Sequence, residues 1–501
     1  MSTTSDVSPT SSGSIRLVIA SIGLLLLLAS LDQTIVSTAL PTIVSDLGGL
    51  EHLSWVVTAY ILSSTVVAPL YGKLGDLYGR RAMVFIAVGL FMAGSALCGF
   101  AGSMNFLIVA RALQGLGGGG LFVLALSVVG DVIPAKDRGK VQGMFAAVFS
   151  ISSVIGPLMG GWFVQAFSWH WIFFINIPLG LIAVAGFAAS FAANPKRVSH
   201  KIDWTGAALL TVALGALTLV CALGGATLAW DGPLTLALIA LVPVSAAAFL
   251  WVEARAAEPV LPLDLFKGNV FIVTSIIGFV TGAAMFGALT FLPMYLQISK
   301  GQTPTNSGLL LIPMTIGILS TSTVAGISMG RTGRYKRLPI LGTSLMAAGA
   351  FLFTFLSVES SIAYFCAALF VFGLGMGCIF PVVTTAVQNA VPRQQMGTAT
   401  AAGVMFRQIG GSLAVALFGA MFAARLAAGL GTGAEALGGG RIGPQTLTTL
   451  PPEVQAKIGE VIAQAVTPIF WIIVGLALFG LVFSLFLKEV PLVNRMVPKG
   501  E

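Results

Sequence analysis

One carboxylate, Asp32, lies inside the apolar run GLLLLLASLDQTIVSTALP at residues 23–41. A charged side chain at the centre of a bilayer costs at least about 2.5 kcal/mol, and such residues commonly mark ion or proton pathways. Two basic residues, Arg111 and Arg407, also lie well inside apolar segments. We therefore predict that these three residues form a proton-coupling system in a wet central cavity. A fixed ion pair that only holds helices together is the alternative.

The rest of the chain is strongly apolar. Of its 501 residues, 56% are hydrophobic and only 9% are charged, and the mean hydropathy is +0.97. Soluble domains carry about 25% charged residues, and a β-barrel would alternate apolar and polar residues, whereas these apolar runs are continuous. The sequence therefore predicts an all-α integral membrane protein. Fourteen transmembrane helices are expected at about 15–44, 53–71, 82–101, 105–131, 140–165, 170–193, 204–224, 234–254, 269–298, 305–330, 337–356, 360–390, 396–427 and 466–488.

Basic residues gather in alternate loops between these helices. The positive-inside rule places these loops in the cytoplasm, together with both termini, namely a disordered tail at 1–14 and a second tail at 491–501. The net charge of +8 is thus a topology signal, and no nucleic-acid partner is expected. The basic loop residues are Lys73, Arg80, Arg81, Lys136, Arg138, Lys140, Lys196, Arg197, Lys201, Arg331, Arg334, Lys336 and Arg337.

This orientation allows the depth of the buried charged residues in the membrane to be calculated. At about 1.5 Å per residue, Arg111 lies about 9 Å and Asp32 about 12–18 Å below the outer ends of their helices. The two can therefore share a layer, whereas Arg407 lies about 16 Å from the cytoplasmic end. Burial favours the neutral form of Asp32, and a nearby Arg111 would favour the charged form.

The external segment 428–465 differs from the other loops. It begins with a Gly-rich stretch and continues as PPEVQAKIGEVIAQAV. Pro452 can open a short amphipathic helix that places Ile458 and Ile462 on one face. We expect this segment to be either a helix on the outer membrane surface or a plain connecting loop.

A charged glycine motif, GKLGDLYGRRAMV at 72–84, occupies the first cytoplasmic loop. Its glycines allow a tight turn between two helices. Asp76 and Arg80 are four residues apart, a spacing that allows pairing across one helical turn. Alone, a turn of this kind is a weak signal.

Two further glycine motifs lie inside predicted helices. RALQGLGGGG covers 111–120, and GPLMGG covers 156–161. Small residues let helices approach closely in a bilayer, and Pro157 can kink its helix. A kinked helix beside a flat partner can act as a hinge between two conformations, and close packing alone is the alternative.

Other chemistry finds little support in the sequence. It contains no GxSxG, HExxH or P-loop motif, so we expect no catalytic residues, no cofactor and no metal site, and no enzyme activity. Its four cysteines lie in apolar spans and are expected to be small buried side chains. The three histidines lie at or near span ends and form no cluster. A membrane receptor or intramembrane enzyme is the alternative from a different class.

Taken in order, LDQTIVSTALP, GKLGDLYGRR, RALQGLGGGG, GPLMGGW and FRQIGGSLAVALFG strongly resemble the major facilitator superfamily. Within it, the count of fourteen helices and the GPLMGG motif resemble the drug:proton antiporters of the multidrug efflux type. The resemblance spans essentially the whole chain. It implies the major facilitator fold, with six-helix bundles at 15–200 and 261–490 and two linker helices at 201–260.

The resemblance also assigns roles to the motif residues. Asp76 and Arg80 would form a latch that engages neighbouring helix ends in the outward-open state, with Asp131 as the partner of Arg80. The counterpart loop at 330–337 lacks the aspartate, so its latch should be weaker or absent. The latch residues are Gly72, Gly75, Asp76, Gly79, Arg80, Arg81, Asp131 and Arg138, and the antiporter hinge comprises Gly156, Pro157, Gly160 and Gly161.

The function implied is export of lipophilic or cationic drugs in exchange for protons by alternating access, with Asp32 as the proton carrier. We expect a monomer in the cell (inner) membrane whose partners are the small-molecule substrate, protons and membrane lipids. Because the chain has one deep acid, neutral or weakly cationic compounds are favoured over dications. Export of an endogenous lipid or secondary metabolite is the alternative. The predicted substrate cavity includes Trp55, Tyr60, Gln114, Phe145, Phe149, Phe286 and Met294.

Overall fold

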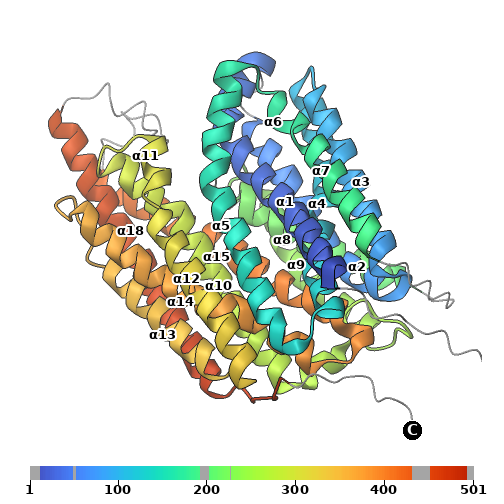
Figure 1. The fold of residues 1–501 in the computed structure, drawn as a ribbon. Coiled ribbons are helices and arrows are strands. Elements are labelled where there is room, and N and C mark those ends of the chain that lie inside the picture. Colours follow the sequence, from blue (N-terminus) through green and yellow to red (C-terminus); the bar gives the residue numbers. More distant parts are fainter. Residues whose placement is uncertain (1–11, 49–51, 192–201, 226, 431–451, 493–501) are drawn as a thin grey trace, which may run out of the picture.

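The computed structural model consists almost entirely of long α-helices that run side by side (Figure 1). It describes residues 12–48, 52–191, 202–225, 227–430 and 452–492. Each helix forms its backbone hydrogen bonds within itself, as a membrane requires, because hydrocarbon offers no hydrogen-bonding partners. The all-helical class predicted from the continuous apolar runs is therefore confirmed.

The first half of the chain forms one group of packed helices. Its members are α1 (Ser12–Leu47), α2 (Leu53–Tyr78), α3 (Arg80–Gly99), α4 (Met104–Val132), α5 (Ala135–Ala166), α6 (Trp171–Phe174) and α7 (Asn176–Ser190). Helix α4 packs against α2 and α3, and α1 packs against α5 and α7. Buried aliphatic and aromatic side chains fill the spaces between these helices. The Ser103 hydroxyl caps α4 by accepting a hydrogen bond from the Phe106 N–H at 3.4 Å.

Two helices, α8 (Trp204–Leu223) and α9 (Pro233–Glu253), follow and pack on each other. Asp203 caps α8 by accepting a hydrogen bond from the Gly206 N–H at 2.8 Å. At the end of α9, the Glu253 carboxylate accepts hydrogen bonds from the Val260 and Leu261 N–H groups at 3.0 and 3.2 Å. These bonds fix the turn through which the chain enters its second half.

The second half forms another group of packed helices, which lies beside the first in Figure 1. The pairs α12–α14, α10–α15 and α13–α14 contact each other around a large apolar core. The elements are η2 (Leu263–Lys267), α10 (Asn269–Ile298), α11 (Pro304–Leu309), α12 (Ile312–Thr332), α13 (Arg337–Phe353), α14 (Ile362–Ala390), η3 (Arg393–Gln395), α15 (Met396–Leu430) and α18 (Pro452–Leu485).

Twelve helical segments within the described ranges are long and apolar enough to cross a membrane. The two other predicted spans are also helical. Helix α5 has 32 residues, which is about 48 Å at about 1.5 Å per residue, and α13 has 17 residues. All fourteen predicted spans are thus helices, although two fall outside the twelve.

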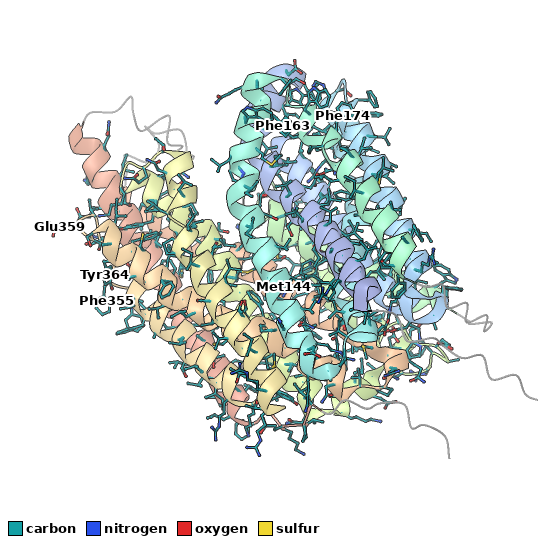
Figure 2. The ribbon with its side chains drawn as sticks, viewed as in Figure 1. Met144, Phe163, Phe174, Phe355, Glu359 and Tyr364 are labelled. Carbon is teal, nitrogen blue, oxygen red and sulfur yellow. The ribbon has the colours of Figure 1, made fainter. Side chains whose placement is uncertain are left out.

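Large apolar side chains cover the outer surface of the helices. Met144 on α5 and Phe355 just after α13 are 53% and 58% exposed, and Figure 2 shows both on the outside of the ribbon. Trp162, Leu181 and Trp251 are similarly exposed. A continuous apolar surface of this kind is suited to contact with lipid.

The structure differs from the prediction in the segment 428–465. Helix α18 begins at Pro452 and runs without interruption to Leu485. Ile458 and Ile462 are 1% and 0% exposed because they pack into the core of the second half. The amphipathic pattern therefore marks the buried face of a long helix rather than a helix on the membrane surface. Residues 431–451 lie outside the described residues, as do the predicted tails at 1–11 and 493–501.

The two halves meet closely near the basic loops. A Cβ added at Gly143 of α5 would lie 2.9 Å from the Ser322 carbonyl oxygen of α12. A Cβ added at Gly72 of α2 would lie 2.8 Å from the Gly397 carbonyl oxygen of α15. Glycine is required at these points because any larger residue would separate the two halves.

Candidate functional site

The Asp32 carboxylate lies in a dense polar cluster inside the first half. Arg111 Nη1 donates a hydrogen bond to Asp32 Oδ2 at 2.6 Å, and Gln114 Nε2 donates to Asp32 Oδ1 at 2.7 Å. Asn176 Nδ2 donates to the same Oδ1 atom at 3.0 Å. The cluster therefore joins α1, α4 and α7 through one carboxylate, and the predicted proximity of Asp32 and Arg111 is confirmed.

Arg111 is held from several sides. Its Nη1 also donates to Gln114 Oε1 at 2.6 Å, and its Nε donates to the Val56 carbonyl oxygen at 3.2 Å. The Tyr60 ring lies under the guanidinium, 4.3 Å from its carbon atom. Ser95 of α3 completes the cluster by accepting a hydrogen bond from Gln114 at 3.1 Å. This cation is thus paired with an acid, hydrogen-bonded and stacked on an aromatic ring.

The cluster is sealed inside the first half rather than open to a cavity. Asp32, Gln114 and Arg111 are 0%, 0% and 1% exposed, and Asn176 is 1% exposed. Removing one partner of a buried ion pair costs about 3–5 kcal/mol. Asp32 and Arg111 do share a layer, as predicted. In this conformation, however, neither side chain lines the cavity, because both lie on a different helix face from the one that lines it.

A cavity of about 190 Å³ lies between the two halves. Helices α1, α2, α4 and α5 line one side, and α10, α12, α14 and α15 line the other. Most of the lining is apolar. Its polar and charged side chains are Ser30, Gln33, Ser64, Gln142, Thr315, Thr384, Arg407 and Gln408.

The predicted cavity residues divide into three groups. Phe145 and Phe286 line the cavity, as does Arg407. Tyr60 and Gln114 instead belong to the buried Asp32 cluster. Three others complete the set: Trp55 is half-buried away from the cavity, Met294 packs against the core of the second half, and the Phe149 side chain lies outside the described residues.

Sequence reasoning missed the glutamines of the cavity, Gln33, Gln142 and Gln408. It also missed Asn176 and Ser95 of the Asp32 cluster. Each is a single uncharged polar residue within an apolar span. That position is the signal that could have found them, because a polar group in hydrocarbon needs a partner.

Asp76 joins the two halves near the basic loops. Its carboxylate accepts hydrogen bonds from the Gly397 N–H at 3.0 Å and the Thr398 N–H at 2.7 Å. It also accepts one from the Thr398 hydroxyl at 2.9 Å. Asp76 thus caps the first turn of α15, where free N–H groups and the helix dipole favour a negative charge.

Arg80 supports this contact from the first half. It forms a short ion pair with Asp76, and its Nε donates to Asp131 Oδ2 at 3.0 Å, which confirms the predicted contact with Asp131. Gly79 precedes it with a φ of 92°, a conformation that favours glycine. A Cβ added at Gly75 would lie 2.6 Å from Arg80 Nη1 and would crowd the guanidinium.

The other predicted latch residues act within the first half. Arg81 donates hydrogen bonds to the Phe191 and Ala188 carbonyl oxygens at 2.9 and 3.1 Å, near the end of α7. Arg138 donates to the Ile133 and Gly130 carbonyl oxygens at the end of α4. Both arginines therefore hold helix ends in place.

An acidic residue from outside the loop binds the backbone of the loop at 330–337. The Glu489 carboxylate accepts hydrogen bonds from the Tyr335 and Lys336 N–H groups at 3.0 and 3.3 Å. Because Glu489 follows α18, this contact lies within the second half.

The predicted hinge in α5 packs on α1. A Cβ at Gly156 would overlap the Thr34 hydroxyl, and one at Gly160 would overlap the Thr38 hydroxyl. Pro157 lies inside the same helix. Gly161 faces open space, with no atom within 4 Å of an added Cβ. The close-packed face thus comprises Gly156 and Gly160.

No group of three His, Cys, Asp or Glu side chains in the described part of the chain could hold a metal ion. A cavity shared by two groups of membrane-length helices, joined at one end by a charged cap, defines a multi-pass membrane transport protein. The chain belongs to the Major Facilitator Superfamily, whose family model matches residues 22–415. The protein is therefore a transporter and not an enzyme.

Two curated relatives extend this likeness. An uncharacterized MFS-type transporter of Mycobacterium tuberculosis is 39% identical, over 93% of this chain and 69% of that protein. The multidrug transporter protein MdtP of Bacillus subtilis is 35% identical, over 93% of this chain and 92% of that protein. Among solved structures, the proton:xylose symporter XylE matches with a TM-score of 0.63 and 14% identity, over 96% and 98% of the two chains. That last likeness shows the fold alone.

Proposed function

We propose that the protein exports lipophilic small molecules in exchange for protons by alternating access. This proposal rests on the cavity that both halves line, together with the Asp76 cap that joins the halves at one end. We further propose fourteen transmembrane helices, arranged as two bundles at 15–200 and 261–490 with α8 and α9 as linkers. The protein would act as a monomer in the cell membrane.

The basic loops give the proposed cycle a direction. If they face the cytoplasm, the Asp76 cap closes the cytoplasmic side and this conformation is outward-facing. Opening to the cytoplasm then requires Asp76 to leave the first turn of α15 and α5 to separate from α12. The packing of Gly156 and Gly160 on α1 supports α5 as the helix that moves.

Asp32 is the proposed proton carrier. Its charged form accepts hydrogen bonds from Arg111, Gln114 and Asn176. A protonated carboxyl no longer balances the Arg111 charge, so the contact between α1 and α4 weakens on protonation. Helix α1 places Ser30 and Gln33 in the cavity. A change at Asp32 therefore reaches the substrate site within one helical turn.

The test compares Asp32→Asn with Asp264→Asn. Asparagine has the size of aspartate but carries no charge, whereas Asp264 is an exposed carboxylate paired with Lys267. Both variants would be reconstituted in proteoliposomes with a dye that the unmodified protein moves, chosen from a panel of neutral, cationic and anionic dyes. We expect Asp32→Asn to abolish pH-gradient-driven transport, because the asparagine amide cannot bind and release a proton as a carboxylate does, while Asp264→Asn retains it.

If Asp32 and Arg111 form only a fixed structural ion pair, the variants should show a different pattern of stability and transport. In that case Asp32→Asn lowers the melting temperature and reduces gradient-driven and downhill transport together, because an unpaired Arg111 destabilises the fold. A carrier role predicts instead that downhill movement of the dye persists. Unchanged gradient-driven transport in a folded Asp32→Asn protein would exclude Asp32 as the carrier.

An endogenous lipid or secondary metabolite would use the same cavity and the same cycle. Growth in a panel of drugs separates the two substrate classes, because overexpression of a drug exporter raises the inhibitory concentrations. Unaltered drug sensitivity, combined with proton-driven transport of extracted cell lipids or metabolites, would favour the endogenous substrate.

A further inference from the structure

Arg407 is the one charged residue that lines the central cavity within the described part of the chain. It lies on α15 of the second half. Its guanidinium carbon is 5.3 Å from the ring centre of Phe122 and 5.6 Å from that of Phe380. Phe122 belongs to α4 of the first half, so the cation lies where the two halves meet.

The environment of Arg407 contrasts with that of Arg111. Arg111 is ion-paired with Asp32 and hydrogen-bonded to Gln114. Among the described residues, Arg407 has neither an ion pair nor a hydrogen bond to another side chain, and its contacts are the two aromatic rings. The side chain is only partly exposed in a mostly apolar cavity, where a charge without a partner is costly. Its position therefore favours a ligand that supplies the missing negative charge.

Two glutamines that line the cavity carry buried hydrogen-bond acceptors. The Oε1 atoms of Gln142 and Gln408 are buried and accept no hydrogen bond from the residues that the structure describes. Both residues line the same cavity as Arg407. Buried acceptors of this kind are normally satisfied by protein groups, water or ligand. They suit a ligand that also carries a hydroxyl or N–H donor.

The charge of the cavity lining also disfavours a cation. None of the described residues that line it is acidic. Two of its aromatic faces, Phe122 and Phe380, are already directed at Arg407. A cationic ligand would thus meet a like charge without a compensating carboxylate, which disfavours it.

We infer that the central cavity selects lipophilic organic anions, and that Arg407 binds their carboxylate or phenolate group. The planar guanidinium suits this role because it presents a fork of donors that matches a carboxylate. The apolar lining, which includes Phe145, Phe286 and Leu289, holds the body of the ligand. The inference rests on the proposed function and differs from the neutral or weakly cationic substrates expected from the sequence.

The test uses three probes of one shape, naphthalene-1-carboxylate, 1-naphthylmethanol and 1-naphthylmethylammonium. Their binding to the purified protein is measured by titration calorimetry at pH 8, with binding to empty micelles subtracted. We expect the carboxylate to bind at least about tenfold more tightly than the ammonium, as is typical of a hydrogen bond to a charged group. Equal binding, or tighter binding of the ammonium, would overturn the inference without any variant.

Three variants locate the effect at one side chain. Arg407→Gln should weaken carboxylate binding about 10- to 100-fold and leave the alcohol unchanged. Arg407→Lys should give an intermediate loss because it keeps the charge without the planar fork. The matched control is Arg425→Gln, an exposed arginine on the same helix, which should bind all three probes normally. Unaltered carboxylate binding in Arg407→Gln would also overturn the inference.

This experiment separates the two proposals because it requires neither a membrane nor a proton gradient. Preferential carboxylate binding without movement of any probe in proteoliposomes would refute the export function and retain the anion site. Proton-driven movement of the ammonium in preference to the carboxylate would refute the anion site and retain export.

Discussion

Replacing Asp76 with asparagine should release the contact between the two halves near the basic loops. The Asp76 carboxylate accepts three hydrogen bonds from the first turn of α15, at 3.0, 2.7 and 2.9 Å. Asparagine keeps one acceptor oxygen but loses the charge, and its amide donors would face the N–H groups of α15. The closed arrangement should therefore lose stability relative to the open one.

The size of this effect follows from the contacts. A hydrogen bond to a charged group contributes about 1.5–3 kcal/mol, against about 0.5–1.5 kcal/mol for a neutral one. An anion at a helix N-terminus adds about 0.3–1 kcal/mol. We allow for partial replacement by the asparagine oxygen and expect a loss of about 2–3 kcal/mol. This corresponds to a shift of about 30- to 150-fold in the equilibrium between closed and open forms.

Distances between spin labels measure the shift directly. Lys140 of α5 and Arg331 of α12 are both exposed and lie on the two helices that must separate. Cysteines at these positions would carry the labels in a chain whose native cysteines are replaced by alanine. The unmodified latch should give one short distance, and Asp76→Asn should add a longer one. Asp264→Asn, which alters an exposed carboxylate, is the control and should give the short distance alone.

An unchanged distance distribution in Asp76→Asn would refute this reasoning. In that case the packing of α5 on α12 would suffice to hold the halves together, and the Asp76 cap would contribute nothing measurable.

Two further predictions concern the hinge and the buried cluster. Gly156→Ala should lower the melting temperature and the transport rate because its Cβ would overlap the Thr34 hydroxyl, whereas Gly161→Ala should change neither. If the two variants had equal effects in thermal melts and dye transport, this packing argument would be contradicted. Gln114→Leu should reduce stability by about 1–3 kcal/mol because it deprives Asp32 of a hydrogen-bond donor, and it should shift the pH at which transport is half-maximal. A pH profile identical to that of the unmodified protein would show that Gln114 does not tune Asp32.

The sequence predicts the helical class and a shared depth for Asp32 and Arg111 because both follow from local rules. Apolar run length gives the spans, and the rise per residue gives the depth of each charge. Helix rotation follows from neither rule, because it depends on the packing of α1 against α4, α5 and α7. This is why the Asp32 cluster was expected to face the cavity but lies one helix face away from it.

The partner of Asp76 illustrates a second limit. The spacing of Asp76 and Arg80 indicates a pair across one helical turn, and that pair is present. Gly397 and Thr398 are more than 300 residues away in the sequence, and nothing local connects them to Asp76. The start of α18 was missed for a related reason: a half-apolar segment packs equally well on a membrane or on a protein core, and only the surrounding helices decide.

Helix α1 connects Asp32, the proposed proton carrier, to the rest of the proposed cycle. One face carries Asp32, which binds α4 and α7. A second face carries Ser30 and Gln33, which line the cavity. Thr34 lies one helical turn after Ser30, beside this second face, and its hydroxyl donates a hydrogen bond to the Ser152 carbonyl oxygen of α5 at 3.0 Å.

The residues that make these contacts lie within five positions of α1, or about 6 Å along the helix axis. Helix α5 in turn contacts α12 of the second half where Gly143 meets Ser322. A small rotation of α1 on protonation of Asp32 would therefore alter the cavity wall and the interface between the halves in one step. A sealed carboxylate is suited to this role, because its charge is felt through packing while water in the cavity cannot screen it.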